Sequence, residues 1–239
     1  YEADREILKG IDLCLSAGSF VSLVGGSGCG KSTVAGILGG RNRGYSGSVT
    51  VGGIPLSQVR EEELMKRVVL VRSNSYLFKG TVEENLKMAK PDATKEEMET
   101  VLQKVNLLGF LETQDGLQTQ LLEKAANLSG GQCQRLAIAR ALLRREASVY
   151  IFDEATSNID VESEALIMEV IHELAKTKTV LLISHRLANV VQSDKIYFLR
   201  DGEIQESGTH EELMAAKGAY SRLFDSQMAL ECYGKGGVA

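Results

Sequence analysis

The chain has 239 residues and a formal net charge of −5. This length suits one compact unit with a subdomain, and the acidic balance argues against an extended nucleic-acid surface, so no nucleic-acid partner is expected. The apolar runs, such as residues 180–183, are a few residues long, whereas a membrane span needs about 20 apolar residues. The sequence therefore predicts neither a transmembrane helix nor a secretory signal.

The cysteines and the first residue bear on the setting of the chain. The four cysteines are widely separated and form no C-x-x-C pair, which favours reduced thiols in a cytosolic compartment over a zinc site or a disulfide framework. The chain begins with Tyr1 rather than Met, so we expect a fragment or a processed product of a longer protein.

The first predicted elements surround a glycine-rich segment. Residues 19–24 are typical of a short strand, and residues 32–38, which follow the glycines, are small and apolar like a helix packed on a sheet. Residues 46–51 alternate in polarity and run into Gly52 and Gly53, which predicts a hairpin.

Capping boxes predict several helix starts. Thr81, Thr94 and Thr209 are each followed three residues later by Glu, and this spacing lets the two side chains satisfy the first backbone N–H groups of a helix. After Thr94, apolar residues recur on one helical face. We predict that residues 74–145 are mostly helical.

The C-terminal half alternates between strand and helix patterns. Residues 149–152 and 180–183 are short apolar runs, typical of strands buried on both faces. An amphipathic helix is predicted between them, and Asp201 with Gly202 predicts a hairpin turn. The whole pattern predicts an α/β fold with a mainly parallel sheet, an inserted helical subdomain and an antiparallel β part.

Residues 25–32 fit the pattern G-x-x-x-x-G-K-[ST] between the predicted strand and helix. Glycines let backbone N–H groups curl around a phosphate, and the helix that follows points its positive end at the anion. Lys31 would span the β- and γ-phosphates, and Ser32 would supply a Mg²⁺ ligand. The candidate nucleotide-binding residues are Gly26, Ser27, Gly28, Cys29, Gly30, Lys31, Ser32 and Thr33. Cys29 occupies a position where any small residue would serve.

The strand predicted at residues 149–152 ends in two carboxylates, Asp153 and Glu154. Asp153 at the carboxyl end of a strand would hold Mg²⁺ directly or through water. Glu154 would act as the general base that polarises the attacking water. Two carboxylates after an apolar strand are a weak motif alone, but together with residues 25–32 they specifically indicate a nucleotide-binding site.

A further phosphate-facing helix start is predicted at residues 128–132. Ser129 and Gln132 form another capping box, and Gly130 and Gly131 between them leave the helix N-terminus bare, as close approach to a phosphate requires. One nucleotide cannot easily use two separate helix N-termini of one small domain. We therefore expect a second subunit, so that each nucleotide lies between residues 25–32 of one chain and residues 129–132 of the other.

These motifs together resemble the nucleotide-binding domain of an ATP-binding-cassette (ABC) transporter. The resemblance covers residues 1–228, and the segments around residues 77–85, 183–187 and 208–213 resemble the exporter branch. It implies a P-loop NTPase core formed by residues 1–72 and 146–228, a helical subdomain at about residues 73–145, and a flexible tail at residues 229–239.

The resemblance implies roles for further residues. Tyr1 stands at the adenine-stacking position, and His185 aligns with the histidine that contacts the γ-phosphate, so Lys31, Glu154 and His185 form the expected catalytic set. Asp160 would touch the opposing subunit, or cap the next helix, or both. Glu123 would face the membrane domain, although the glycines usual around that position are absent here.

The main departure from the family lies at Ser73. The family normally carries a glutamine there that reaches Mg²⁺ and the attacking water, and a serine is too short to make both contacts. We hypothesise that Mg²⁺ coordination and coupling are weakened or rerouted through Asn74.

The resemblance implies a function at the cytoplasmic face of the cell membrane. ATP and Mg²⁺ are the expected cofactors, and the expected partners are a second nucleotide-binding domain, identical or related, and a transmembrane domain fused upstream or separate. ATP hydrolysis would then power export. The alternatives are a soluble ABC-type ATPase in repair, translation or iron–sulfur assembly, and a structural protein with a degenerate nucleotide site.

Overall fold

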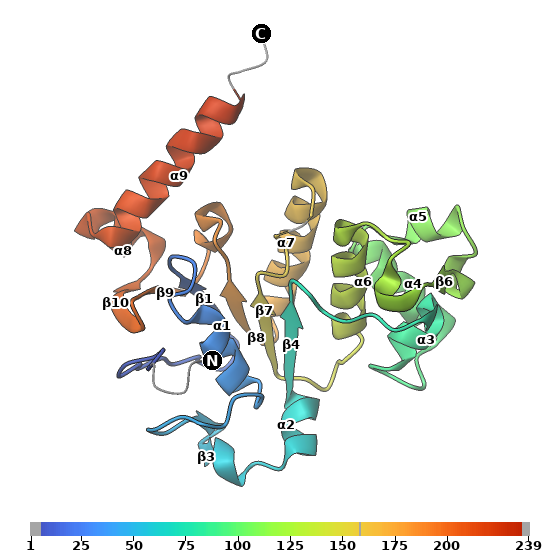
Figure 1. Ribbon diagram of the computed structural model, residues 1–239, viewed down its shortest axis with the longest axis horizontal. Coiled ribbons are helices and arrows are strands. Elements are labelled where there is room, and N and C mark those ends of the chain that lie inside the picture. Colours follow the sequence, from blue (N-terminus) through green and yellow to red (C-terminus); the bar gives the residue numbers. More distant parts are fainter. Residues whose placement is uncertain (1–5, 158, 236–239) are drawn as a thin grey trace.

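The computed structural model describes residues 6–157 and 159–235 (Figure 1). The predicted adenine contact of Tyr1 therefore lies outside the described residues. Among these residues, no helix combines the length and the apolarity needed to cross a membrane.

A six-stranded sheet forms the centre of the molecule, in the order β10-β9-β1-β8-β7-β4. The strands β1, β4, β7, β8 and β9 run parallel to their neighbours, and β10 pairs antiparallel with β9 across the predicted turn at Asp201 and Gly202. The bounds are β1 Phe20–Val24, β4 Val68–Arg72, β7 Val149–Asp153, β8 Thr179–Ile183, β9 Lys195–Arg200 and β10 Glu203–Gly208. The predicted α/β class is confirmed.

Alternating side chains of the central strands divide between two apolar cores. Leu23, Leu181 and their equivalents pack with α1 (Lys31–Leu38) and α2 (Glu61–Arg67) on one face of the sheet. Val24, Leu182 and their equivalents pack on the other face with α7 (Val161–Ala175). Both faces are covered, which explains why these strands read as nearly continuous apolar runs.

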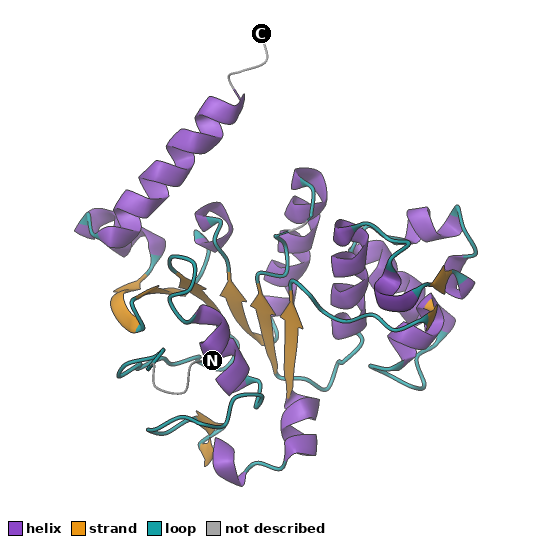
Figure 2. Ribbon diagram, in the orientation of Figure 1, coloured by secondary structure: helices purple, strands orange, loops and turns teal. Residues whose placement is uncertain are grey.

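A mostly helical segment follows β4 and lies to one side of the sheet (Figure 2). It contains α3 (Val82–Lys87), α4 (Lys95–Lys104), α5 (Leu108–Glu112), α6 (Gly130–Leu142) and the short antiparallel pair β5 (Gly80–Thr81) and β6 (Gln120–Leu121). The predicted capping boxes at Thr81 and Thr94 are both formed. The apolar side chains of this segment belong to the same core as the α7 face of the sheet, so the segment is anchored to the strands that carry the predicted carboxylates.

The remaining elements are short, apart from the last helix. The predicted hairpin consists of β2 (Thr50–Val51) and β3 (Ile54–Pro55), and α8 (His210–Ala216) starts at the predicted capping box of Thr209. Single turns of 3₁₀ helix span Leu56–Gln58, Gly116–Gln118, Glu123–Ala125 and Leu187–Val190.

The C-terminal helix α9 (Ala219–Lys235) continues past residue 229, where the sequence suggested the start of a flexible tail. Gly234, one of the glycines that motivated that boundary, lies inside the helix, and Gly236 and Gly237 fall outside the described residues. The beginning of α9 is held by the buried Tyr220 and by the Glu206 carboxylate, which accepts the backbone N–H groups of Ala219 and Tyr220. Residue 229 is therefore not a boundary of secondary structure.

Candidate nucleotide-binding site

The glycine-rich loop lies between the end of β1 and the start of α1. Gly30 is the N-cap of α1, with φ of 111°, and no side chain caps the first N–H groups of this helix. A Cβ atom on Gly25 would lie 2.0 Å from the Leu199 carbonyl oxygen, so a larger residue cannot occupy that position without moving the sheet. The loop and the open helix start fit a phosphate group.

Lys31 is a buried cation whose ammonium group bonds to backbone carbonyl oxygens. Its side chain is 6% exposed, and its Nζ donates to the carbonyl oxygens of Gly25 at 2.9 Å and Gly26 at 2.8 Å. Within residues 6–157 and 159–235 it forms no ion pair with a carboxylate. Because burying an uncompensated charge is costly, this position is suited to an anionic ligand.

Ser32 and Asp153 bring two oxygen donors together from distant parts of the chain. The Ser32 hydroxyl donates to Asp153 Oδ1 at 3.0 Å. Burial raises the pKa of Asp153, and the hydrogen bond from Ser32 and the charges of Arg72 and Lys31 partly offset this increase. A hydroxyl and a carboxylate are the hard ligands that Mg²⁺ prefers, so the residues present fit this ion.

Glu154 faces the same groove as the loop. The groove has a volume of about 1460 Å³, and its lining includes residues 26–33 and Glu154. The backbone of Glu154 adopts a left-handed φ of 51°, and its N–H donates to the Ile183 carbonyl oxygen at 3.0 Å. A non-glycine residue held in this conformation is typical of functional sites.

Sequence motifs do not indicate several residues on the far wall of the groove. Arg200 of β9 and Arg222 and Ser226 of α9 also line it. These three residues belong to no recognisable sequence motif. Their positions at the groove depend on how β9 and α9 pack in the fold. The structure therefore adds two cations to a groove that is predicted to hold phosphates.

Ser73 lies beside Asp153, as the alignment of strands β4 and β7 requires. Its N–H donates to the Asp153 carbonyl oxygen at 3.0 Å, and Gln134 Nε2 lies 3.5 Å from the carbonyl oxygens of Ser73 and Glu154. Asn74 is exposed. These contacts of Ser73 are made through its backbone.

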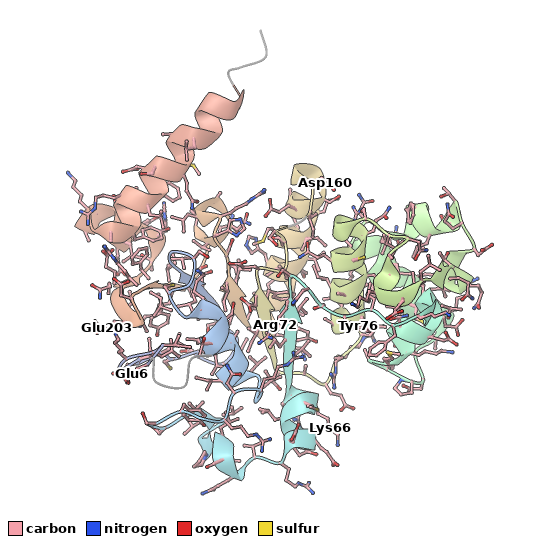
Figure 3. All side chains as sticks on the ribbon, in the orientation of Figure 1. Glu6, Lys66, Arg72, Tyr76, Asp160 and Glu203 are labelled. Atoms are coloured by element: carbon pink, nitrogen blue, oxygen red, sulfur yellow. The ribbon has the colours of Figure 1, made fainter. Side chains whose placement is uncertain are left out.

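Arg72, rather than Asn74, brings a polar side chain toward Asp153. It lies on β4, where Figure 3 labels it, and is the register partner of Asp153. Its Nε lies 3.9 Å from Asp153 Oδ2. This Nε is buried and has no hydrogen-bond acceptor among the described residues. Sequence analysis missed Arg72 because strand β4 is not among the predicted elements, and without that strand its register with Asp153 cannot be inferred.

The predicted capping box at residues 129–132 is formed at the start of α6. The Ser129 N–H donates to Gln132 Oε1 at 2.8 Å, and the Gln132 N–H donates to Ser129 Oγ at 3.2 Å. Ser129 and Gly130 are exposed. None of the four residues lines the groove at residues 26–33, and Figure 1 shows α6 on the other side of the sheet from α1.

The other predicted site residues lie in separate loops. His185 is exposed just after β8. Asp160 caps α7 by accepting the Ser163 N–H at 2.9 Å, and hydrogen bonds from Ser163 lower the pKa of this carboxyl (Figure 3). Glu123 is exposed, and the next residues, Lys124 and Ala125, adopt the left-handed φ values of 55° and 52° that glycines would adopt more easily.

The fold and the site together define a P-loop nucleotide-binding domain. A strand leads through a glycine loop into a helix, and a neighbouring strand ends in Asp153 and Glu154 beside Lys31 and Ser32. In parallel α/β sheets, ligands bind at the carboxyl ends of the strands, and all four of these side chains lie at that edge.

Comparison with known proteins gives the family. Residues 8–157 match the model of the ABC transporter family. An uncharacterized ABC transporter ATP-binding protein of Haemophilus influenzae is 46% identical over 97% of this chain and 41% of its own length. The ATP-dependent lipid A-core flippase of Chromobacterium violaceum is 38% identical over 95% of this chain and 39% of its own length. The chain belongs to the ABC transporter family.

A solved structure confirms the fold. The structure of a bacterial Atm1-family ABC exporter with ATP bound superimposes with a TM-score of 0.90 and 32% identity, over 95% of this chain and 40% of the exporter chain. The chain thus spans about two fifths of the length of these relatives.

Proposed function

We propose that this chain binds and hydrolyses Mg·ATP and that hydrolysis powers export by a membrane transporter. The observation that carries the proposal is the buried Lys31, which forms no ion pair with a carboxylate among the described residues and lies next to the hydrogen-bonded pair Ser32 and Asp153. Glu154 faces the same groove. A buried cation, a pair of Mg²⁺ ligands and a carboxylate are together suited to phosphoryl transfer to water.

Each residue has a distinct part in this proposal. Lys31 and the N-terminus of α1 hold the β- and γ-phosphates, and Glu154 accepts a proton from the attacking water. Ser32 and Asp153 would hold Mg²⁺, whose charge offsets that of the phosphates when it is bound. His185 contacts the γ-phosphate from the loop after β8, and backbone N–H groups of residues 26–33 surround the rest of the triphosphate.

A second nucleotide-binding domain completes the site. The α6 start at residues 129–132 has the glycines of an anion-facing helix, is exposed, and does not line the groove of its own chain. We therefore propose that it binds the nucleotide held by an identical or related partner, and that Asp160 lies at the same interface. The groove and the α6 start then close over two nucleotides.

A transmembrane domain is the second proposed partner. The chain spans about two fifths of the length of two of its relatives, a flippase and an exporter. A second groove of about 610 Å³ is lined by the exposed side chains of Met65, Phe78 and Met88 and by several arginines. Exposed apolar patches rimmed by charge are typical of docking surfaces. We propose that this groove receives a segment of the transmembrane domain at the cytoplasmic face of the membrane, with Glu123 facing the same domain.

The soluble alternatives have no observation in their favour. The relatives that carry a stated activity move lipid or act as exporters. Lys31, Ser32 and Glu154 line one groove, and Ser32 is hydrogen-bonded to Asp153, which supports an active ATPase over a degenerate structural protein.

An ATPase assay on the Lys31→Ala variant tests the proposal. We expect the rate to fall by at least about 100-fold, because the variant loses a preorganised cation at the transferring phosphate. Lys66→Ala, which removes an exposed lysine of α2, serves as the matched control and should keep the wild-type rate. Equal rates for the Lys31→Ala variant and the wild type would rule out the proposed site.

A further inference from the structure

The C-terminal helix is hydrogen-bonded to the loop that carries His185. Gln227 of α9 donates from Nε2 to the His185 carbonyl oxygen at 2.6 Å, and its Oε1 accepts the Leu187 N–H at 2.9 Å. One side-chain amide thus bonds the backbone carbonyl oxygen before Arg186 and the backbone N–H after it. A glutamine is suited to this contact because its amide both donates and accepts.

The position of this amide is fixed by the packing of α9. Tyr220 is fully buried, and Leu223 and Phe224 pack against the same core as Leu187. Gln227 follows Tyr220 by about two helical turns and lies on the same face. Glu206 of β10 also accepts the first N–H groups of α9. These contacts fix the position of the helix and therefore of the Gln227 side chain.

The opposite side of the loop is held by α7. The buried carboxylate of Glu164 forms an ion pair with Arg186 and accepts a hydrogen bond from Asn189 Nδ2 at 2.9 Å. Ser184 Oγ accepts the Arg186 N–H at 3.0 Å. The backbone around His185 is therefore fixed from two helices, while His185 itself is exposed at the carboxyl end of β8.

We propose that Gln227 is a positioning residue that sets the His185 ring for contact with the terminal phosphate of ATP. This inference rests on the proposed function, because it requires His185 to act on the nucleotide. Neither Gln227 nor His185 is among the residues that line the groove at residues 26–33. The hydrogen bonds of Gln227 go to the backbone on both sides of Arg186, so it acts through the loop rather than on ATP. Small displacements of a group that must meet a reacting phosphate carry large rate losses.

The first test compares steady-state ATPase kinetics of variants of the 239-residue chain. Gln227→Met removes both hydrogen bonds at similar size, and Gln227→Glu keeps the acceptor but replaces the donor with a second acceptor. We expect both to lower kcat by roughly 10- to 100-fold with little change in KM. Asp225→Met, an exposed position on the opposite face of α9, is the matched control and should keep the wild-type kcat.

The decisive comparison uses His185→Ala as a background. If Gln227 acts through His185, adding Gln227→Met to His185→Ala causes no further loss. An equal loss in both backgrounds, or a wild-type kcat for Gln227→Met beside a slow His185→Ala, overturns the role of Gln227 and leaves the proposed function intact. A wild-type rate for His185→Ala overturns the nucleotide role of His185 and this inference with it.

A second readout does not depend on activity. Hydrogen exchange at the Leu187 N–H should be faster in Gln227→Met than in Asp225→Met, because the first variant removes its acceptor. Both variants should keep the exchange protection of the central strands, which shows that they are folded. Unchanged protection at Leu187 would contradict the proposed contact.

Discussion

At the scale of single residues, the nucleotide site places charges where they are unfavourable for the free protein. Lys31 is buried and forms no ion pair with a carboxylate within the part of the chain that the structure describes, and burial raises the pKa of Asp153. In the proposed function both features are useful when phosphates and a metal ion bind, because these ligands would supply the compensating charges. The site therefore trades stability for binding, as functional sites commonly do.

Asp153→Asn should stabilise the metal-free protein at neutral pH. The pKa of Asp153 is raised above its ordinary value of 3.8, so above that raised pKa the charged carboxylate disfavours the folded state. The gain should be largest near pH 7 and should disappear as the pH falls below the ordinary value, where the carboxyl is neutral in both states. Urea unfolding of both proteins at pH 7 and at low pH measures this difference. A lower free energy of unfolding for Asp153→Asn at pH 7 would contradict the interpretation.

At the scale of elements, the predictions succeed where the controlling contacts are local. Capping boxes at Thr81, Thr94, Ser129 and Thr209 are all formed, because their partners lie three residues apart and need no knowledge of the fold. The strands that end in the glycine loop and in Asp153 are also predicted from a local pattern, because a strand buried on both faces forms a short continuous apolar run.

Contacts between distant elements were not predictable in this way. Arg72 meets Asp153 through the register of β4 and β7, and Gln227 meets His185 across 42 residues of sequence. Both contacts depend on which elements lie side by side in the fold, and no local sequence pattern predicts that arrangement. The start of α9 likewise depends on the distant Glu206 and on the burial of Tyr220.

Two capping boxes of the same type offer a comparison at this scale. Ser129→Ala and Thr94→Ala each remove the N-cap of a helix and should each lower the free energy of unfolding by about 1 kcal/mol. Ser129→Ala should also lower the ATPase rate about tenfold, because a hydrogen bond to a charged ligand in the partner's site is lost. Thr94 lies at the start of α4, away from the predicted interface, so its variant should keep the wild-type rate.

Chemical denaturation and an ATPase assay on the same protein samples separate the two effects of these variants. Equal rates for Ser129→Ala and Thr94→Ala would show that the start of α6 is a structural cap only, and the proposed two-subunit site would lose its main support.

At the scale of the whole molecule, the two predicted nucleotide-binding segments lie on different sides of the sheet. The glycine loop and α1 lie on one side, and the segment that carries α6 lies on the other (Figure 1). In the proposed dimer, a single chain therefore presents two halves of a nucleotide site that face different neighbours. In the proposed function, ATP would join two domains in this way, and its hydrolysis could then move an attached membrane domain.

The Glu154→Gln variant tests this account most directly. The amide keeps the size of the side chain but cannot accept the proton of the attacking water. We predict that the variant binds Mg·ATP as tightly as the wild type, leaves it unhydrolysed, and remains associated with a second nucleotide-binding domain, as measured by nucleotide analysis of the bound fraction and by sedimentation. Hydrolysis of the bound ATP at the wild-type rate would contradict the assignment of Glu154 as the base and the mechanism built on it.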